Sequence, residues 1–139
     1  MDVVTTSVEL TLPEAERLVK LYEVRAGSGN PDRIIESFAP DVVVRFADFP
    51  EIRGLAELRP FIAARIARQK NYRLTKQLRA VAGNTIICSW IGAWEDGQNG
   101  QRMEGAGVEF MTLRDGKIIL WEAVFNVWEP GRRGLLPIV

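Results

Sequence analysis

Residues 101–128 read QRMEGAGVEFMTLRDGKIILWEAVFNVW, which is two apolar runs joined at Asp115-Gly116. An Asp-Gly pair between alternating apolar residues is among the strongest local signals of a β-hairpin, because both turn positions need a positive φ. The stretch therefore predicts two antiparallel strands that meet at this turn.

Two carboxylates interrupt these apolar strands, Glu109 in the first and Glu122 in the second. A two-residue turn, or a four-residue loop from Arg114 to Lys117, places them directly opposite each other. Opposed side chains on a sheet have Cβ atoms roughly 4.5–5.5 Å apart, and like charges there are destabilising, so the pair is a candidate chemical site. A three-residue loop with a bulge at Gly116 would instead place the two Glu on opposite faces. The sequence leaves both registers open.

The composition is that of an ordinary globular chain. Its 139 residues suit a single domain spanning residues 1–139. The 18 Lys and Arg balance 18 Asp and Glu, so the charge predicts no nucleic-acid partner and no anionic membrane surface. There is no run long enough to span a bilayer and no signal-peptide pattern. Cys88 is the single cysteine, which fits a reducing compartment. We expect a soluble, cytoplasmic protein.

The sequence contains no histidine. This excludes Ser-His-Asp and Cys-His catalysis and removes the commonest zinc and iron ligands. Acid–base chemistry near neutral pH must therefore come from carboxylates, tyrosine, lysine or a thiol, with pKa values changed by burial or by neighbouring charges. We expect neither a metal nor an organic cofactor.

Helices are predicted mainly before strands along the chain. Thr11 and Glu14 form a capping box that begins a helix ending near Ala26, and Asn30-Pro31 begins a second, short helix. Helices segregated from an antiparallel sheet define the α+β class. The other predicted elements are a strand over 42–46, a loop over 48–54, a third helix over 55–69, and strands over 72–82 and 85–95 that precede the hairpin.

Several segments carry a resemblance to a known family. They are Asn30-Pro-Asp-Arg, Phe38-Ala-Pro-Asp-Val, Arg53-Gly-Leu-Ala-Glu-Leu and Phe110-Met-Thr-Leu-Arg-Asp-Gly-Lys-Ile. Together they resemble the nuclear transport factor 2-like superfamily, also called SnoaL-like or ketosteroid-isomerase-like. The chain looks most similar to a bacterial subfamily of unsettled function, through Asn71-Tyr-Arg-Leu-Thr-Lys-Gln-Leu, Val108-Glu-Phe and Trp121-Glu-Ala-Val-Phe-Asn. The resemblance implies an α+β cone, in which a curved antiparallel sheet and three N-terminal helices close a pocket.

The resemblance also implies which side chains face that pocket. It turns alternate hairpin residues inward, in agreement with the register drawn from a two-residue turn. It further implies that Gly105 and Gly107 widen the pocket and leave a close approach to backbone. The candidate catalytic residues are Glu109, Glu122, Asn126 and Arg45, and the candidate substrate-binding residues are Trp90, Trp94, Tyr72, Met103, Met111, Leu120 and Val124.

The family contains enzymes of several kinds and non-catalytic binding domains, so its fold does not specify a reaction. We expect a cofactor-independent hydrolase, isomerase or cyclase, epoxide-hydrolase-like or polyketide-cyclase-like, in which Glu109 and Glu122 act as acid and base on a small hydrophobic substrate. The alternative is a non-catalytic small-molecule-binding domain of the same fold. A structural alternative for the site is a buried ion network of Glu109, Glu122 and Arg45.

Other residues are assigned to less specific roles. Lys76 is expected in solvent, together with Arg65 and Arg68 of the third predicted helix, and Cys88 is expected to be a small buried hydrophobe. The convex face of the sheet is expected to expose apolar side chains, which predicts a symmetric homodimer packed sheet to sheet. The residues assigned to that face are Val108, Phe110, Trp121, Ala123, Phe125 and Val127.

Overall fold

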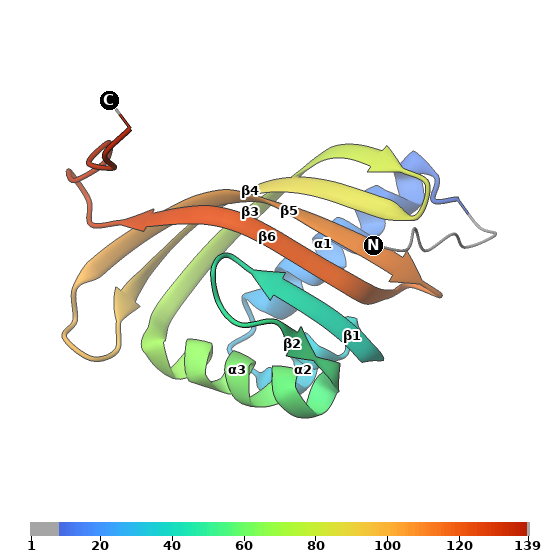
Figure 1. Ribbon diagram of the computed structural model, residues 1–139, viewed down its shortest axis with the longest axis horizontal. Coiled ribbons are helices and arrows are strands. Elements are labelled where there is room, and N and C mark those ends of the chain that lie inside the picture. Colours follow the sequence, from blue (N-terminus) through green and yellow to red (C-terminus); the bar gives the residue numbers. More distant parts are fainter. Residues whose placement is uncertain (1–8, 139) are drawn as a thin grey trace.

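Figure 1 shows the computed structural model, which describes residues 9–138 of the chain. The helices are α1 (Leu12–Ala26), α2 (Pro31–Ile35) and α3 (Gly54–Arg68). The strands are β1 (Phe38–Phe46), β2 (Ile52–Arg53), β3 (Gln69–Ala82), β4 (Thr85–Asp96), β5 (Arg102–Arg114) and β6 (Lys117–Trp128). The predicted α+β class is confirmed, and the short strand β2 lies in the segment predicted as a loop. In residues 9–138, no helix has the length and hydropathy needed to cross a bilayer.

The first two helices begin where their capping residues predict. The side-chain oxygen of Thr11 accepts a hydrogen bond from the amide of Glu14 at the start of α1. The side-chain oxygen of Asn30 accepts one from the amide of Asp32 at the start of α2. Each bond satisfies an amide that has no partner within its own helix, and this fixes the residue at which the helix begins.

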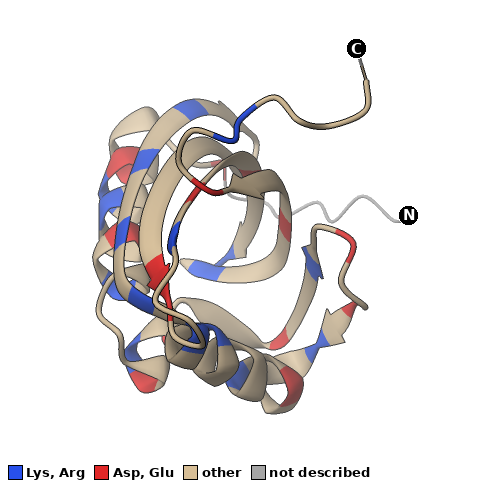
Figure 2. Cartoon of the chain, turned by 90° about the vertical axis from the view of Figure 1, so that its left-hand side faces the viewer, with Lys and Arg blue, Asp and Glu red and all other residues tan. Residues whose placement is uncertain are grey.

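The described strands form one sheet in the order β2-β1-β6-β5-β4-β3. Strands β1 and β6 pair in parallel, and every other neighbouring pair is antiparallel. The sheet curls, and α3 lies across its open side at the bottom of Figure 2. The hydrophobic core lies between the concave face and the helices, and its most deeply buried members include Val42, Val44, Leu58, Ile86 and Met111.

The hairpin turn has the predicted geometry. Arg114 pairs with Lys117, and Asp115 and Gly116 between them have φ values of 51° and 75°. Positive values at both positions are what a two-residue turn of this type requires. The two-residue turn is therefore confirmed.

A β-bulge at Ile119 changes the register beyond the turn. Leu113 pairs with Ile118, but Thr112 pairs with Leu120, so Ile119 is an extra residue in β6. Because side chains alternate with a period of two, one extra residue reverses the face of every residue that follows. Ile118 and Ile119 are both buried, and burying both apolar side chains stabilises the irregular ladder.

The predicted facing of Glu109 and Glu122 is wrong for this reason. Glu109 pairs with Ala123, and Glu122 pairs with Phe110. Glu109 lies on the concave side and is 3% exposed, whereas the side chain of Glu122 is 36% exposed on the opposite face. The alternative register placed a bulge at Gly116. The bulge lies at Ile119 instead, and it likewise places the two Glu on opposite faces of the sheet.

The bulge also exchanges the predicted faces of most of β6. Trp121 and Ala123 are buried in the core and Phe125 packs against it, whereas Val124 is 63% exposed. The assignment of Trp121, Ala123 and Phe125 to the convex face is therefore wrong. The assignment of Leu120, Val124 and Asn126 to the concave face is wrong as well.

The end of α3 is fastened to the turn between β4 and β5. Arg68 donates two hydrogen bonds to the carboxylate of Asp96, from Nε to Oδ1 at 2.6 Å and from Nη2 to Oδ2 at 2.8 Å. Oδ1 of Asp96 also accepts from the amide of Gln98 at 2.9 Å, and the amide of Gly97 donates to the carbonyl of Arg68 at 2.7 Å. These bonds hold α3 across the open side of the sheet.

We expect the substitution Asp96→Asn to lower the midpoint of thermal unfolding by a few degrees near neutral pH. The hydrogen bonds from Arg68 lower the pKa of the Asp96 carboxyl. Such a group stabilises the fold fully above its unfolded pKa of about 3.9 and loses that contribution as pH falls through the lower, folded pKa. The difference between wild type and variant should therefore shrink below about pH 4. Circular dichroism melts across this range measure it, and a pH-independent difference would contradict the assignment.

Candidate functional site

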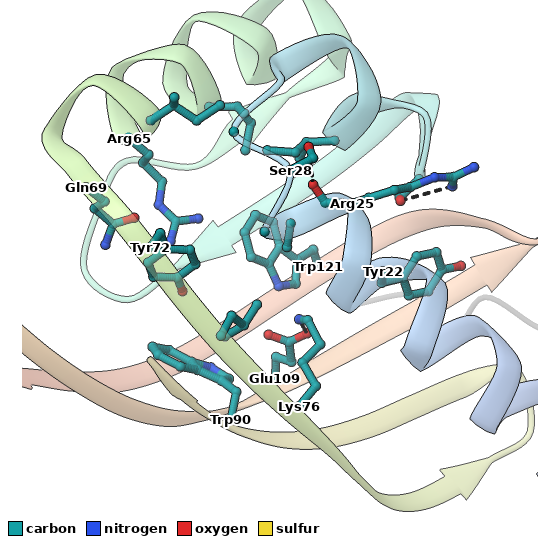
Figure 3. Close-up of a pocket in the computed structure, with 18 of the residues that line it drawn as sticks. Tyr22, Arg25, Ser28, Arg65, Gln69, Tyr72, Lys76, Trp90, Glu109 and Trp121 are labelled. Carbon is teal, nitrogen blue, oxygen red and sulfur yellow. Dashed lines mark hydrogen bonds and ion pairs between the residues drawn. The ribbon is translucent and has the colours of Figure 1, made fainter. Parts of the chain in front are cut away.

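A cavity of about 330 Å³ lies between the concave face of the sheet and the helices (Figure 3). It is lined mainly by apolar side chains, because alternate residues of the strands and one stripe of α3 point into it. The volume is at the lower end of the range of roughly 300–1,000 Å³ that is usual for small-molecule sites. The apolar lining includes Phe46, Ile62, Trp90, Met111, Ile118 and Trp121.

A buried ion pair forms part of the cavity wall. Nζ of Lys76 on β3 contacts Oε1 of Glu109 on β5, and their side chains are 7% and 4% exposed. The pair reaches across β4, where Lys76 is the partner of Trp90 and Glu109 is the partner of Cys88. Figure 3 shows both side chains together in the pocket. The expectation that Lys76 lies in solvent is wrong, because the carboxylate of Glu109 compensates its charge inside the cone.

Helix α1 fixes the backbone at Lys76 from one side. The amide of Lys76 donates a hydrogen bond to Oε2 of Glu23 at 2.9 Å. This bond favours the charged form of the carboxyl and lowers the pKa of Glu23. The position of the buried ammonium therefore depends on packing between α1 and β3.

The thiol of Cys88 lies beside the same ion pair. Burial raises the pKa of this thiol to about 11; the charge of Glu109 acts in the same direction, and that of Lys76 opposes it. A thiol with such a pKa stays protonated near neutral pH and is a poor nucleophile. The expectation that Cys88 is a small buried hydrophobe is confirmed, because the residue is 0% exposed.

A second group of polar side chains lies at the junction of α3 and β3. Arg65 of α3 places the carbon of its guanidinium 4.7 Å from the ring centroid of Phe46. Tyr72 of β3 lies over Gly92, where a Cβ atom would come within 3.3 Å of the tyrosine hydroxyl. Both Arg65 and Tyr72 line the cavity, and Figure 3 shows them with Gln69 along the same side. The expectation that Arg65 lies in solvent is therefore wrong.

The charges of this group influence one another. Burial raises the pKa of the Tyr72 phenol, and the guanidinium of Arg65 partly offsets that rise. Burial lowers the pKa of Arg65, while Tyr72 and Glu109 act in the opposite direction. The phenol therefore keeps its proton near neutral pH and can donate a hydrogen bond, and an arginine retains its charge in proteins.

The structure brings together some of the predicted site residues. Glu109, Tyr72, Trp90 and Met111 line the cavity. Trp94 and Met103 line a separate hollow with Arg73 and Glu104. The other predicted site residues do not line the cavity, and these are Glu122, Asn126, Arg45, Leu120 and Val124.

Arg45 and Glu122 lie together outside the cavity. Nη1 of Arg45 is 3.5 Å from Oε2 of Glu122, and its Nε donates to Oε1 of Glu51 at 3.0 Å. The expected buried network with Glu109 is therefore replaced by an exposed ion pair and a separate buried one. Among the described residues, no group of three or more His, Cys, Asp or Glu is arranged to hold a metal ion.

The two glycines of β5 do not widen this cavity. A Cβ atom at Gly107 would lie 2.4 Å from the carbonyl oxygen of Val124, so this residue permits close packing of β5 on the backbone of β6. Gly105 lies under the indole of Trp94, with a contact of 3.2 Å for its Cβ position. Close approach to backbone is confirmed for Gly107, and the widening of this cavity is wrong for both.

Two cavity cations were present in the sequence pattern but were assigned to solvent. Lys76 continues the alternation of Tyr72 and Leu74 on β3, which points it inward. Arg65 follows Ile62 by three residues on α3 and shares its stripe. The positions of Lys76 and Arg65 therefore indicated that both side chains point into the cavity. The prediction that they lie in solvent followed from the preference of charged groups for water.

Comparison with known proteins identifies the family to which this fold belongs. The chain belongs to the SnoaL-like domain family, whose model matches residues 18–121. It has the nuclear transport factor 2-like, or ketosteroid-isomerase-like, fold that the resemblance predicted. No curated protein matches the chain.

Three solved structures illustrate the likeness. SalBIII, an epoxide hydrolase/cyclase-like enzyme of pyran ring formation in salinomycin, has 17% identity and a TM-score of 0.75 over 84% of this chain and 96% of that one. A protein from Xanthomonas campestris described as a polyketide cyclase has 24% identity and a TM-score of 0.68, covering 81% and 90%. A ketosteroid-isomerase-like protein from Catenulispora acidiphila in complex with trimethylamine has 16% identity and a TM-score of 0.71, covering 82% and 86%. At these identities the likeness concerns the fold.

Proposed function

We propose that this chain is a small-molecule enzyme that moves a proton on a hydrophobic ligand held in the cavity, with Glu109 as the general base and acid. The observation that supports this role most strongly is that Glu109 is the one carboxylate among the described residues lining the cavity. It is 3% exposed, and apolar side chains surround the space in front of it. A carboxylate in such a place can take a proton from a C–H or O–H group of the ligand.

Other polar side chains of the cavity supply complementary roles. The protonated phenol of Tyr72 can donate a hydrogen bond to a carbonyl oxygen on which negative charge develops when Glu109 removes a neighbouring proton. The ammonium of Lys76 holds the Glu109 carboxylate in position. The resulting enolate either regains the proton from Glu109 at another carbon, which is isomerisation, or attacks a carbonyl carbon of the same molecule. In the second case the C=O π bond breaks, its oxygen takes the electron pair and then the proton from Glu109, and a ring is closed.

The arrangement favours isomerisation or cyclisation over hydrolysis by two carboxylates. In the epoxide-hydrolase type of chemistry, one carboxylate activates water while a second protonates the leaving oxygen. Glu122 would be the second carboxylate, but it lies on the opposite face beside Arg45. The cavity offers one carboxylate and several hydrogen-bond donors, which suits the transfer of a proton between two positions of one ligand.

A non-catalytic binding domain is the second candidate function. The ion pair between Lys76 and Glu109 favours it, because a carboxylate that is already paired and buried can be purely structural. In that case the cavity binds hydrophobic ligands and turns none of them over.

Proton abstraction from nitrobenzisoxazole tests the proposal. A base removes the ring C–H proton of this flat, apolar probe, and the N–O bond breaks to release a coloured phenolate. We expect saturable acceleration by the protein at least about 100-fold above an equal concentration of acetate. A rate no faster than acetate, together with calorimetric binding of naphthalene amides, would support the binding domain instead.

We also propose that the chain forms a homodimer through the convex face of the sheet. After correction of the β6 faces, this surface still exposes Ile91 and Val124, each 63%, beside the 38% exposed Phe110. Sedimentation velocity at micromolar concentration should give a dimer, and Val124→Glu should weaken it about tenfold or more because it places a charge in an apolar contact. A wild-type monomer at tens of micromolar would contradict this proposal.

A further inference from the structure

We propose that Arg65 binds the carboxylate of an organic acid, so that the ligand of the cavity is an amphipathic molecule with a compact ring body and one anionic group. This inference rests on the proposed function, because it assigns a substrate class to the same cavity.

Arg65 is a cation on the cavity wall without a carboxylate partner. Among the described residues its guanidinium forms no ion pair. The ring of Phe46 lies at 4.7 Å, Tyr72 is a second neighbour, and the charge of Glu109 acts on it without direct contact. A guanidinium presents several N–H donors in a planar fork, and an aromatic ring and a phenol do not satisfy them all. A ligand anion would complete this shell from the cavity side.

Two of the other three cations of the cavity lining already have partners. Lys76 is paired with Glu109. Arg25 donates to the hydroxyl of Ser37 at 3.2 Å and lies 3.6 Å from a carboxylate oxygen of Glu36. The third, Lys70, is exposed, so Arg65 is the more buried of the two lining cations that have no carboxylate partner among the described residues.

The charge of the whole lining favours an anion. Among the described lining residues, Arg25, Arg65, Lys70 and Lys76 are cationic and Glu109 is the one carboxylate. A cleft lined by an excess of one sign attracts ligands of the opposite sign, and low-dielectric walls strengthen that attraction. Lys76 also offsets the negative charge of Glu109, with which it is paired.

The geometry indicates a carboxylate on a compact apolar body. Guanidinium matches carboxylate with two parallel hydrogen bonds, and the single O–H of Tyr72 stays available to the reacting carbonyl oxygen. The rest of the cavity is lined by Trp90, Trp121 and Met111, which suit a ring system. A space of about 330 Å³ has room for a body of one or two rings.

Naphthoic acid and naphthamide form a matched pair of probes, because they share one ring body and differ in charge. Isothermal titration calorimetry near neutral pH should show that the wild-type protein binds naphthoate about tenfold or more tightly than naphthamide. The variant Arg65→Gln should lose about 30-fold in naphthoate affinity and stay within about threefold for naphthamide. Arg65→Lys should retain part of the preference, since it keeps the charge without the fork.

Arg59→Gln on the same helix is the matched control. Arg59 lies outside the cavity and is paired with Asp32, so its removal changes net charge equally and should leave both affinities unchanged. Equal acid-to-amide ratios in folded Arg65→Gln and wild type would overturn the inference. Failure of both probes to bind folded wild type would overturn the inference and the proposed function together. An Arg65-dependent preference for the acid without turnover of nitrobenzisoxazole would uphold the anion site and refute the proposed catalysis.

Discussion

Glu109→Gln should lower the rate of proton abstraction from nitrobenzisoxazole by about 10²–10⁴-fold, which is the usual contribution of a positioned general base. Glutamine keeps the shape of the side chain and can still accept a hydrogen bond from Lys76, but it cannot take up a proton. Binding of neutral ligands should change little, because the apolar lining is intact. Stopped-flow or steady-state absorbance of the phenolate measures the rate, and calorimetry measures binding.

Glu122→Gln is the matched control for this experiment. The two carboxylates would lie side by side if β6 had no bulge, and they lie on opposite faces because it has one. Glu122 contacts Arg45 at the surface, so its substitution should leave the rate within about twofold of wild type. An equal loss in both variants would contradict the register, and a full rate in Glu109→Gln would contradict the role of Glu109.

Lys76→Met should destabilise the fold by about 3–5 kcal/mol, because it leaves the carboxylate of Glu109 buried without a partner. Replacing both members of the pair, as in Lys76→Met with Glu109→Leu, should restore much of this loss, since apolar groups of similar volume tolerate the site. Urea denaturation near neutral pH measures the free energies of unfolding, and the double-mutant cycle gives the coupling between the two residues.

An exposed lysine provides the comparison. Lys20 on α1 bridges Glu23 at 3.2 Å, with 74% of its side chain exposed. Lys20→Met should cost less than about 1 kcal/mol, because solvent screens surface pairs. If Lys76→Met costs no more than Lys20→Met, the Lys76–Glu109 pair is not held in a dry interior.

Much of the fold could be predicted because its signals are local. The capping residues Thr11 and Asn30 act within one helical turn, and Asp115-Gly116 sets its own turn geometry. The order of elements then restricts the chain to an α+β arrangement. The family resemblance supplied the curvature of the sheet, which the local signals do not contain.

The bulge could not be predicted from the sequence around it. Ile118, Ile119, Leu120 and Trp121 form an uninterrupted apolar run, so either face of β6 can be buried at this point. The choice depends on how Ile118 and Trp121 pack in the core, which involves residues far away in the chain. Four of the eleven predicted site residues were misplaced by this single step, namely Leu120, Glu122, Val124 and Asn126.

The cavity cations were missed for a different reason. Periodicity places both Lys76 and Arg65 on inward faces, but burying a charge is costly unless a partner accompanies it. The partner of Lys76 is Glu109, two strands away in the sheet, and Arg65 lies over Phe46 of β1. Such partners are brought together by the tertiary fold, and sequence spacing does not reveal them.

In a regular strand, the face taken by one side chain fixes the face of every other side chain. The bulge removes this constraint between the two halves of β6. Residues before Ile119 keep the parity set by the turn, and residues after it have the opposite parity. A chain shortened by this one residue would exchange inner wall for outer wall: Trp121 and Phe125 would leave the interior, and Glu122 and Asn126 would enter it. One residue of strand length therefore separates a cavity with a single carboxylate from a cavity with an opposed pair, without any change of side-chain chemistry.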